Sequence, residues 1–218
     1  MRNRALRGAV HSGRETMARR TSARYGRSVM AGAALMSAAF LGAGAAAADW
    51  GLEELMRSLA QVRKASASFV ERKYLRILSE PLESSGTLTY SAPSRLEKNT
   101  LLPRAESMIL DQDRVTLEDK ARRQRRTFDL RTQPALRPFV ESIRATLAGD
   151  LATLQRYYRI ALDGDRDRWR LLLTPGESSM RAAVTEIRIA GGGTRVDSIE
   201  IIEPTGDRSE MTISEIQP

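Results

Sequence analysis

The chain has no cysteine, and its single histidine, His11, lies in an N-terminal segment that we expect to be removed. Without these residue types, the Ser-His-Asp and Cys-His catalytic mechanisms are not available. Zinc, copper and haem sites also lose their usual ligands, and disulfides are excluded. No glycine-rich phosphate-binding loop occurs. We therefore expect no metal site and no cofactor.

Two carboxylates would still be enough for glycoside hydrolysis. Many acidic residues, however, fall where the sequence indicates turns, and such carboxylates usually accept backbone hydrogen bonds or face water. The turn positions are Asp111, Asp113, Glu118, Asp119, Asp163, Asp165, Asp167 and Asp207. The sequence therefore favours a protein that binds or transports a ligand, with no catalytic residues, over an enzyme.

Acidic residues are nearly absent from the N-terminal segment. Residues 1–48 hold 8 of the 35 Lys and Arg residues but one acidic residue, Glu15. The rest of the chain carries 27 basic and 26 acidic residues, so it is almost neutral although the whole chain has a net charge of +8. Domains that bind nucleic acid are usually strongly basic. We therefore expect no nucleic-acid partner.

The N-terminal segment has the three parts of a secretory signal peptide. Eight arginines come first, an apolar run rich in small residues follows over 28–45, and Ala46, Ala47 and Ala48 precede Asp49. The apolar run is short for a membrane span. We expect cleavage near Ala48, which leaves a single domain over 49–218. With no cysteine for a lipid anchor, a soluble protein in the periplasm is the expected product, and outright secretion is the lesser alternative. We also expect a monomer.

Helical periodicity appears in two places, over 52–65 and 136–154. Pro138 suits the first turn of the second segment, Gly149 its end, and Asp150 the cap of a further short helix. Roughly ten short runs with strand-like alternation make up the remainder. The pattern predicts an α+β fold, in which a curved antiparallel sheet forms an open half β-barrel covered by an N-terminal helix and a helical insertion acting as a lid.

Two interpretations of these helices stay open. If they fill the half-barrel, the protein is a packed domain. If they only cap it, the interior can hold a small apolar ligand, as other β-barrels do.

Three segments resemble the LolA-like family of periplasmic outer-membrane lipoprotein carriers. Residues 66–73, SASFVERK, are similar to the family pattern A-S-F-x-Q-x-K. Residues 85–96 are similar to its hairpin S-G-x-L-x-Y-x-x-P-x-x-L, and residues 169–175 to its strand W-x-L-x-L-x-P. The order and spacing of the three segments carry the resemblance, which extends over 49–218.

The resemblance implies an open β-barrel closed by helices around an apolar cavity for the acyl chains of a lipoprotein. It also implies cargo received from an inner-membrane release complex and passed to an outer-membrane acceptor. Two positions depart from the family. Ala92 stands where many members have an arginine that holds the lid closed, and Glu71 replaces the glutamine of the first pattern. The chain thus resembles a divergent branch, whose cargo could be another lipid.

Apolar residues of the strands and helices are the candidate ligand-binding residues, with ordinary core packing as the alternative for each. The cavity-wall candidates are Leu88, Tyr90, Leu96, Met108, Leu110, Trp169, Leu171 and Leu173. The lid candidates are Leu55, Leu59, Phe139, Val140, Ile143 and Leu147. Four methionines could adapt to acyl chains or simply fill gaps, namely Met56, Met108, Met180 and Met211.

The densest positive charge in this part of the chain lies at Arg122, Arg123, Arg125 and Arg126. A solvated hairpin is one interpretation. In the other, Arg123 and Arg125 dock an acidic partner or lipid phosphates. Two functions therefore compete, a carrier that shields acyl chains and a periplasmic binding or sensor module with the same half-barrel. Lipid that stays with the carrier through purification distinguishes them.

Overall fold

The computed structural model describes residues 50–133 and 136–215, in which eleven strands form one antiparallel sheet. The expected signal peptide and its cleavage site lie outside the described residues. The strands are β1 (Lys64–Tyr74), β2 (Leu82–Ser91), β3 (Arg95–Leu102), β4 (Glu106–Asp111), β5 (Arg114–Asp119), β6 (Gln124–Asp129), β7 (Tyr158–Gly164), β8 (Trp169–Pro175), β9 (Glu186–Gly192), β10 (Arg195–Ile202) and β11 (Arg208–Glu215). Their order is β6-β5-β4-β3-β2-β1-β11-β10-β9-β8-β7, so the sheet does not close and β6 and β7 are its edges.

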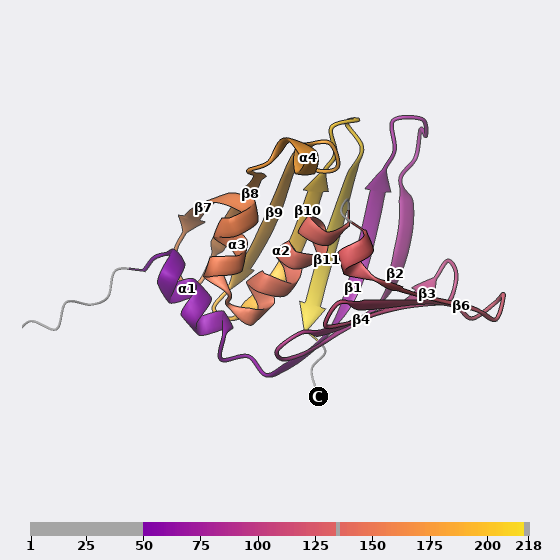
Figure 1. Ribbon diagram of the computed structural model, residues 1–218, viewed down its shortest axis with the longest axis horizontal. Coiled ribbons are helices and arrows are strands. Elements are labelled where there is room, and N and C mark those ends of the chain that lie inside the picture. The colour runs from indigo at the N-terminus through magenta and orange to yellow at the C-terminus, as the bar shows by residue number, and fades with distance from the viewer. Residues whose placement is uncertain (1–49, 134–135, 216–218) are drawn as a thin grey trace, which may run out of the picture. The chain divides into compact units, whose positions relative to one another are not determined.

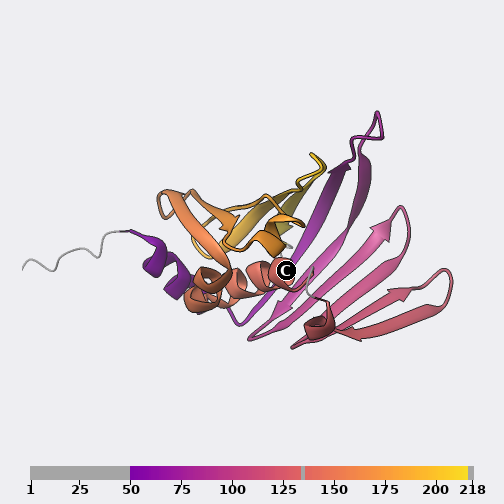
Figure 2. The same ribbon diagram turned by 45° about the horizontal axis from the view of Figure 1, so that its top comes forward.

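Helices α1 (Leu52–Leu59), α2 (Arg137–Ala148) and α3 (Leu151–Tyr157) lie against one face of this sheet (Figure 1). A 3₁₀ turn, η1 (Leu130–Thr132), links β6 toward α2, and the short α4 (Ser178–Arg181) lies between β8 and β9. In Figure 2 the sheet curves, and α2 lies in its hollow. The expectation of an α+β fold with an open, curved antiparallel sheet is confirmed.

The strand register places apolar side chains on the hollow side of the sheet, which we call the concave face. Directly opposed residues of antiparallel strands share a face, and alternate residues of each strand do the same. The register pairs Leu171 with Ile189, Ile189 with Ile199, and Ile199 with Met211, so these four side chains share this face. The same face continues through the paired residues of β1 to β5. The opposite, convex face carries mainly Ser, Thr and charged residues. Because the apolar side chains lie on the concave face, the helices pack against that face and not against the convex one.

Most element boundaries agree with the sequence expectations, with three corrections. The N-terminal helix ends at Leu59 rather than near Ala65, because Lys64 and Ala65 pair with β2 and this long-range pairing outweighs the local helical period. The sheet has eleven strands rather than roughly ten. No sequence pattern predicted α4, since four residues are too few for a periodic signal.

The junction after α2 follows the expected rules. Gly149 ends α2 with φ of 66°, and a side chain there would meet the Met56 carbonyl oxygen of α1 at 2.1 Å. Asp150 caps α3 by accepting a hydrogen bond from the Thr153 N–H at 3.0 Å. Glycine at 149 therefore lets α1 and α2 approach closely.

The main core lies between the helices and β7–β10. Trp169 is buried at its centre and donates its indole N–H to the Gly193 carbonyl at 3.0 Å. Gly191 faces it from β9, where an added Cβ would lie 2.6 Å from the indole ring. A second, smaller core of Leu110, Val115 and Leu130 lies under the other half of the sheet.

Candidate ligand-binding face

The concave face changes character along the strand order. On β8 and β9 its residues are sealed, with Leu171, Leu173 and Ile187 all 0% exposed. From β10 through β4 its large apolar side chains are only half-buried, except for Phe69, Tyr90 and Leu110, which are buried. The half-buried set comprises Ile199, Ile201, Met211, Ile213, Leu88, Leu96 and Met108. We call this set the open part of the concave face, and its residues on β8 and β9 the sealed part.

The predicted cavity-wall residues divide between these parts. Trp169, Leu171 and Leu173 belong to the main core in the sealed part. Leu88, Leu96 and Met108 lie in the open part, where the register aligns Leu96 with Tyr90 and Leu110. The structure therefore brings about half of the predicted wall together on a surface that a ligand can contact.

The predicted lid residues divide in the same way. Leu55 and Leu59 of α1 are buried in the main core. All four candidates on α2 are half-buried, namely Phe139, Val140, Ile143 and Leu147. Helix α2 thus keeps a partly uncovered apolar side, whereas α1 is packed into the core.

A buried carboxylate interrupts the apolar surface at its centre. Glu71, on the concave side of β1, is 6% exposed and forms an ion pair with Lys98 of β3. Ser209 donates a hydrogen bond to Glu71 at 2.7 Å, Ser84 donates another at 3.4 Å, and Lys73 lies at 3.9 Å. The glutamine position of the family pattern is therefore a charged, fully engaged centre in this chain.

Electrostatics keep this carboxylate ionised. Burial alone would raise the pKa of Glu71, but attraction and hydrogen bonding by Lys98, with help from Ser209, hold it below its ordinary 4.5. The Lys98 ammonium also lies 4.8 Å from the centre of the Phe69 ring, within the range of a cation–π contact. An acid held ionised in this way is unsuited to donate a proton as a general acid.

Beyond Lys98 the concave face opens into a hollow of about 270 Å³. Met108 and Leu117 contribute its apolar surface, while Glu106 and Asp119 are among its acidic lining residues. Leu117 is among the exposed large apolar side chains. The hollow therefore extends the open part toward β5.

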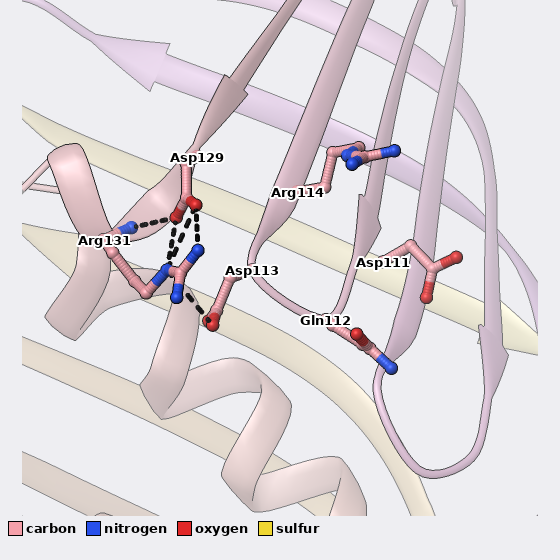
Figure 3. Close-up of a pocket in the computed structure, with 6 residues that line it drawn as sticks. All are labelled: Asp111, Gln112, Asp113, Arg114, Asp129 and Arg131. Atoms are coloured by element: carbon pink, nitrogen blue, oxygen red, sulfur yellow. Dashed lines mark hydrogen bonds and ion pairs between the residues drawn. The ribbon is translucent and has the colours of Figure 1, made fainter.

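A second pocket, of about 430 Å³, is polar and lies at the ends of β4, β5 and β6. Figure 3 shows Arg131 between two carboxylates, at 2.5 Å from Asp129 and 3.7 Å from Asp113. Hydrogen bonds from Arg131 lower the pKa of Asp129 to about 2. The ion pair of Arg131 with Asp113 fastens η1 to the β4–β5 turn, and we assign no ligand to the pocket.

Helix α2 is tethered to the same turn. Arg144 reaches the Gln112 carbonyl at 3.3 Å and pairs with the buried Glu141 at 2.6 Å. Ser142 on this helix contributes a hydrogen bond to Tyr158, whose pKa is raised by burial to about 12. Single polar contacts therefore join α2 to the β4–β5 turn and to Tyr158 of β7.

The comparisons with known proteins show the family of this chain. The model of a family described as outer membrane lipoprotein carrier protein LolA-like matches residues 41–214. The chain belongs to this LolA-like family. A search of curated proteins found no match to it. Within residues 50–133 and 136–215, no helix is both long and apolar enough to span a membrane.

Solved structures similar to this LolA-like chain are distant in sequence. A LolA superfamily protein from Nitrosomonas europaea is 9% identical, with a TM-score of 0.43 over 77% of this chain and 94% of that one. A lipoprotein-sorting protein domain from Vibrio parahaemolyticus is 10% identical, with a TM-score of 0.47 over 76% and 90%. MucB, solved in complex with MucA, is 12% identical, with a TM-score of 0.38 over 75% and 53%.

The family patterns predicted β1, β2 and β8 of this LolA-like chain, but not the residues that complete the open part. Lys98 and Ser209 were missed because pairing with Glu71 depends on register between strands far apart in sequence. The isoleucines of β10 and Ile213 were assigned only to strands. Alternation along β10 and β11 was the one signal that could have placed them on the concave face.

Proposed function

We propose that this LolA-like protein is a periplasmic carrier that holds the acyl chains of a lipoprotein, or of a related lipid, against the open part of the concave face. One observation carries the proposal. An apolar surface, interrupted by the Glu71–Lys98 pair, extends from β10 to β4 and is left half-exposed beneath α2, whereas the sealed part of the same face is fully packed. Contiguous exposed apolar surface of this kind typically marks a binding site.

The chemistry is reversible burial of hydrocarbon. Each methylene removed from water contributes about 0.8 kcal/mol, so about ten buried methylenes contribute roughly 8 kcal/mol before the costs of ordering are subtracted. Displacing α2 to admit the chain lowers the net affinity by whatever that opening costs. Moderate affinity suits a carrier, because cargo that is held too tightly is not delivered.

Helix α2 is the moving element of this proposal. Its apolar side is only half-buried, and the side-chain hydrogen bond that joins it to the β4–β5 turn is the 3.3 Å contact from Arg144. Helix α1, with Leu55 and Leu59 in the main core, stays in place. The donor would be an inner-membrane release complex and the acceptor an outer-membrane protein, as family membership suggests. The signal peptide over 1–48 and export to the periplasm belong to the same proposal.

Native mass spectrometry with lipid extraction tests the proposal on protein isolated from the envelope of the cells that produce it. We expect acyl lipid or lipoprotein to remain bound. A protein that carries no lipid and takes up no fluorescent fatty-acid probe would instead support a binding or sensor module without acyl cargo.

A matched pair of variants locates the site. Leu88→Ser places a hydroxyl in the open part, and Val70→Ser makes a similar change on the convex face, where Val70 is 38% exposed. We expect the first to weaken binding of the fatty-acid probe about fivefold or more and the second to leave it unchanged. Equal affinities for the two variants would place the acyl site elsewhere.

A further inference from the structure

One edge of the sheet differs from the other in charge. Among the described residues, β6 pairs only with β5, so one side of its six-residue backbone has no strand beside it. Figure 2 shows the β5–β6 hairpin as the border of the sheet at that end. The residues Gln124 to Thr127 are all exposed. Edge strands with free N–H and C=O groups are ready to pair with another strand.

Positive charge is concentrated along this edge. Over residues 118–126 there are five basic side chains against two acidic ones. One of those acids, Asp119, already has Arg122 at 3.7 Å and Arg104 at 3.8 Å. The β7 edge, by contrast, holds one basic and one acidic residue, Arg159 and Asp163. Only the β6 edge is therefore complementary to a strongly acidic partner.

The register places arginines on both sides of the edge. Arg125 opposes Glu118 and points to the convex face, while Arg126 opposes Leu117 and points to the concave face. Arg123 lies in the β5–β6 turn with φ of 54°. A strand added beside β6 would therefore have guanidinium groups above and below it. Arg125 lies within β6 and can contact a strand that pairs with it, whereas Arg123 lies before the start of β6.

We propose that the β6 edge binds an extended acidic peptide segment of a partner protein by β-strand addition. Backbone hydrogen bonds would supply affinity, and acidic side chains on alternate faces of the added strand would meet Arg125 and Arg126. Like charges repel a second copy of this edge, so the same arginines discourage self-association. This docking surface is separate from the acyl site and goes beyond the carrier function.

Fluorescence polarisation tests the proposal with the purified protein and a labelled eight-residue peptide in which Glu-Glu and Val-Val pairs alternate, so that carboxylates lie on both faces of the added strand. We expect binding that weakens as salt is raised. We also expect it to fall at least tenfold in an Arg125→Glu/Arg126→Glu variant. Arg159→Glu/Arg170→Glu, on β7 and β8, is the control with the same charge change and should bind as the parent protein does. The unfolding midpoints of all three proteins verify that they are folded.

A second peptide separates strand addition from simple charge attraction. In it, all interior backbone nitrogens are methylated, which removes the donors along both sides of the strand while keeping the charge. We expect its binding to be at least tenfold weaker. Equal binding of both peptides, or equal loss in both double variants, would overturn the proposal. So would the absence of peptide binding together with Arg125-dependent binding to phosphatidylglycerol vesicles, which would make the edge a membrane contact.

Discussion

The sealed and open parts of the concave face share one sheet and one apolar pattern, yet helices cover them unequally. In the sealed part, Leu171 and Ile187 are completely buried under α1 and α3 and their neighbours. In the open part, Leu88 and Met211 are also large apolar side chains on the concave face but keep access to solvent. The contrast teaches that residue type selects the face, whereas helix placement decides which residues stabilise the fold and which can receive a ligand.

The largest expected effect compares leucine truncations in the two parts. Leu171→Ala should lower the free energy of unfolding by about 3 kcal/mol, because it leaves a cavity in a packed core. Leu88→Ala should cost about 1 kcal/mol, since its side chain is already half in water. Urea denaturation measures both values. Equal losses would remove the distinction between the parts.

The next effect concerns the close contact between α2 and α1, the helix that packs on the main core. Gly149→Ala adds a methyl group 2.1 Å from the Met56 carbonyl oxygen, at a residue with φ of 66°. We expect a loss of about 2 kcal/mol in the free energy of unfolding, from backbone strain and the displaced α1. Gly193→Ala is the control, because its φ is 58° but nothing lies within 4 Å of its added methyl group. A similar loss in both variants would assign the effect to backbone conformation alone.

The buried carboxylate at the centre of the open part should make stability depend on pH. Its folded-state pKa is lowered, so its contribution is complete above the unfolded value near 4.5 and disappears as the pH falls through the folded value. Glu71→Gln should cost about 1 kcal/mol near pH 7, a value reduced because Lys98 is partly exposed. The variant should also lose less stability than the parent protein when the pH falls from 5 to 3. Parallel pH profiles in urea denaturation would contradict the assignment.

The smallest expected effect is on the convex face. Arg188 contacts Glu200 at 2.8 Å and Glu186 at 2.6 Å, but its side chain is 44% exposed. Exposed ion pairs contribute little, so Arg188→Ala should change the free energy of unfolding by less than about 0.5 kcal/mol. A thermal unfolding series in 0.05 and 0.5 M salt checks this. A loss comparable to that of Glu71→Gln would mean that burial does not distinguish the two pairs.

Local sequence signals predicted most of the fold. Gly149 and Asp150 mark the α2–α3 junction because glycine favours a left-handed cap and aspartate accepts a hydrogen bond from the first turn. Alternation at Trp169, Leu171 and Leu173 predicted β8 and its buried side. The predicted end of α1 was wrong because Lys64 pairs with Ser91 of β2, and this pairing cannot be seen in the local sequence.

The candidate site was less predictable for a related reason. Alternation assigns a residue to a face, but helix positions in three dimensions decide whether that face is sealed. The sequence therefore predicted both Trp169 and Leu88 as cavity-wall residues, but in the structure Trp169 is buried in the core and Leu88 is half-buried. The Glu71–Lys98 pair joins residues 27 positions apart, and no local pattern predicts it.

The four methionines of the described chain provide the most direct test of the acyl-binding face. Met108 and Met211 lie in the open part, while Met56 and Met180 belong to the main core. In an NMR titration of ¹³C-methyl-methionine protein with monomeric lysophosphatidylglycerol, we expect the Met108 and Met211 methyl signals to shift and those of Met56 and Met180 to stay in place. Shifts confined to Met56 and Met180, or no shift at saturating lipid, would contradict the account.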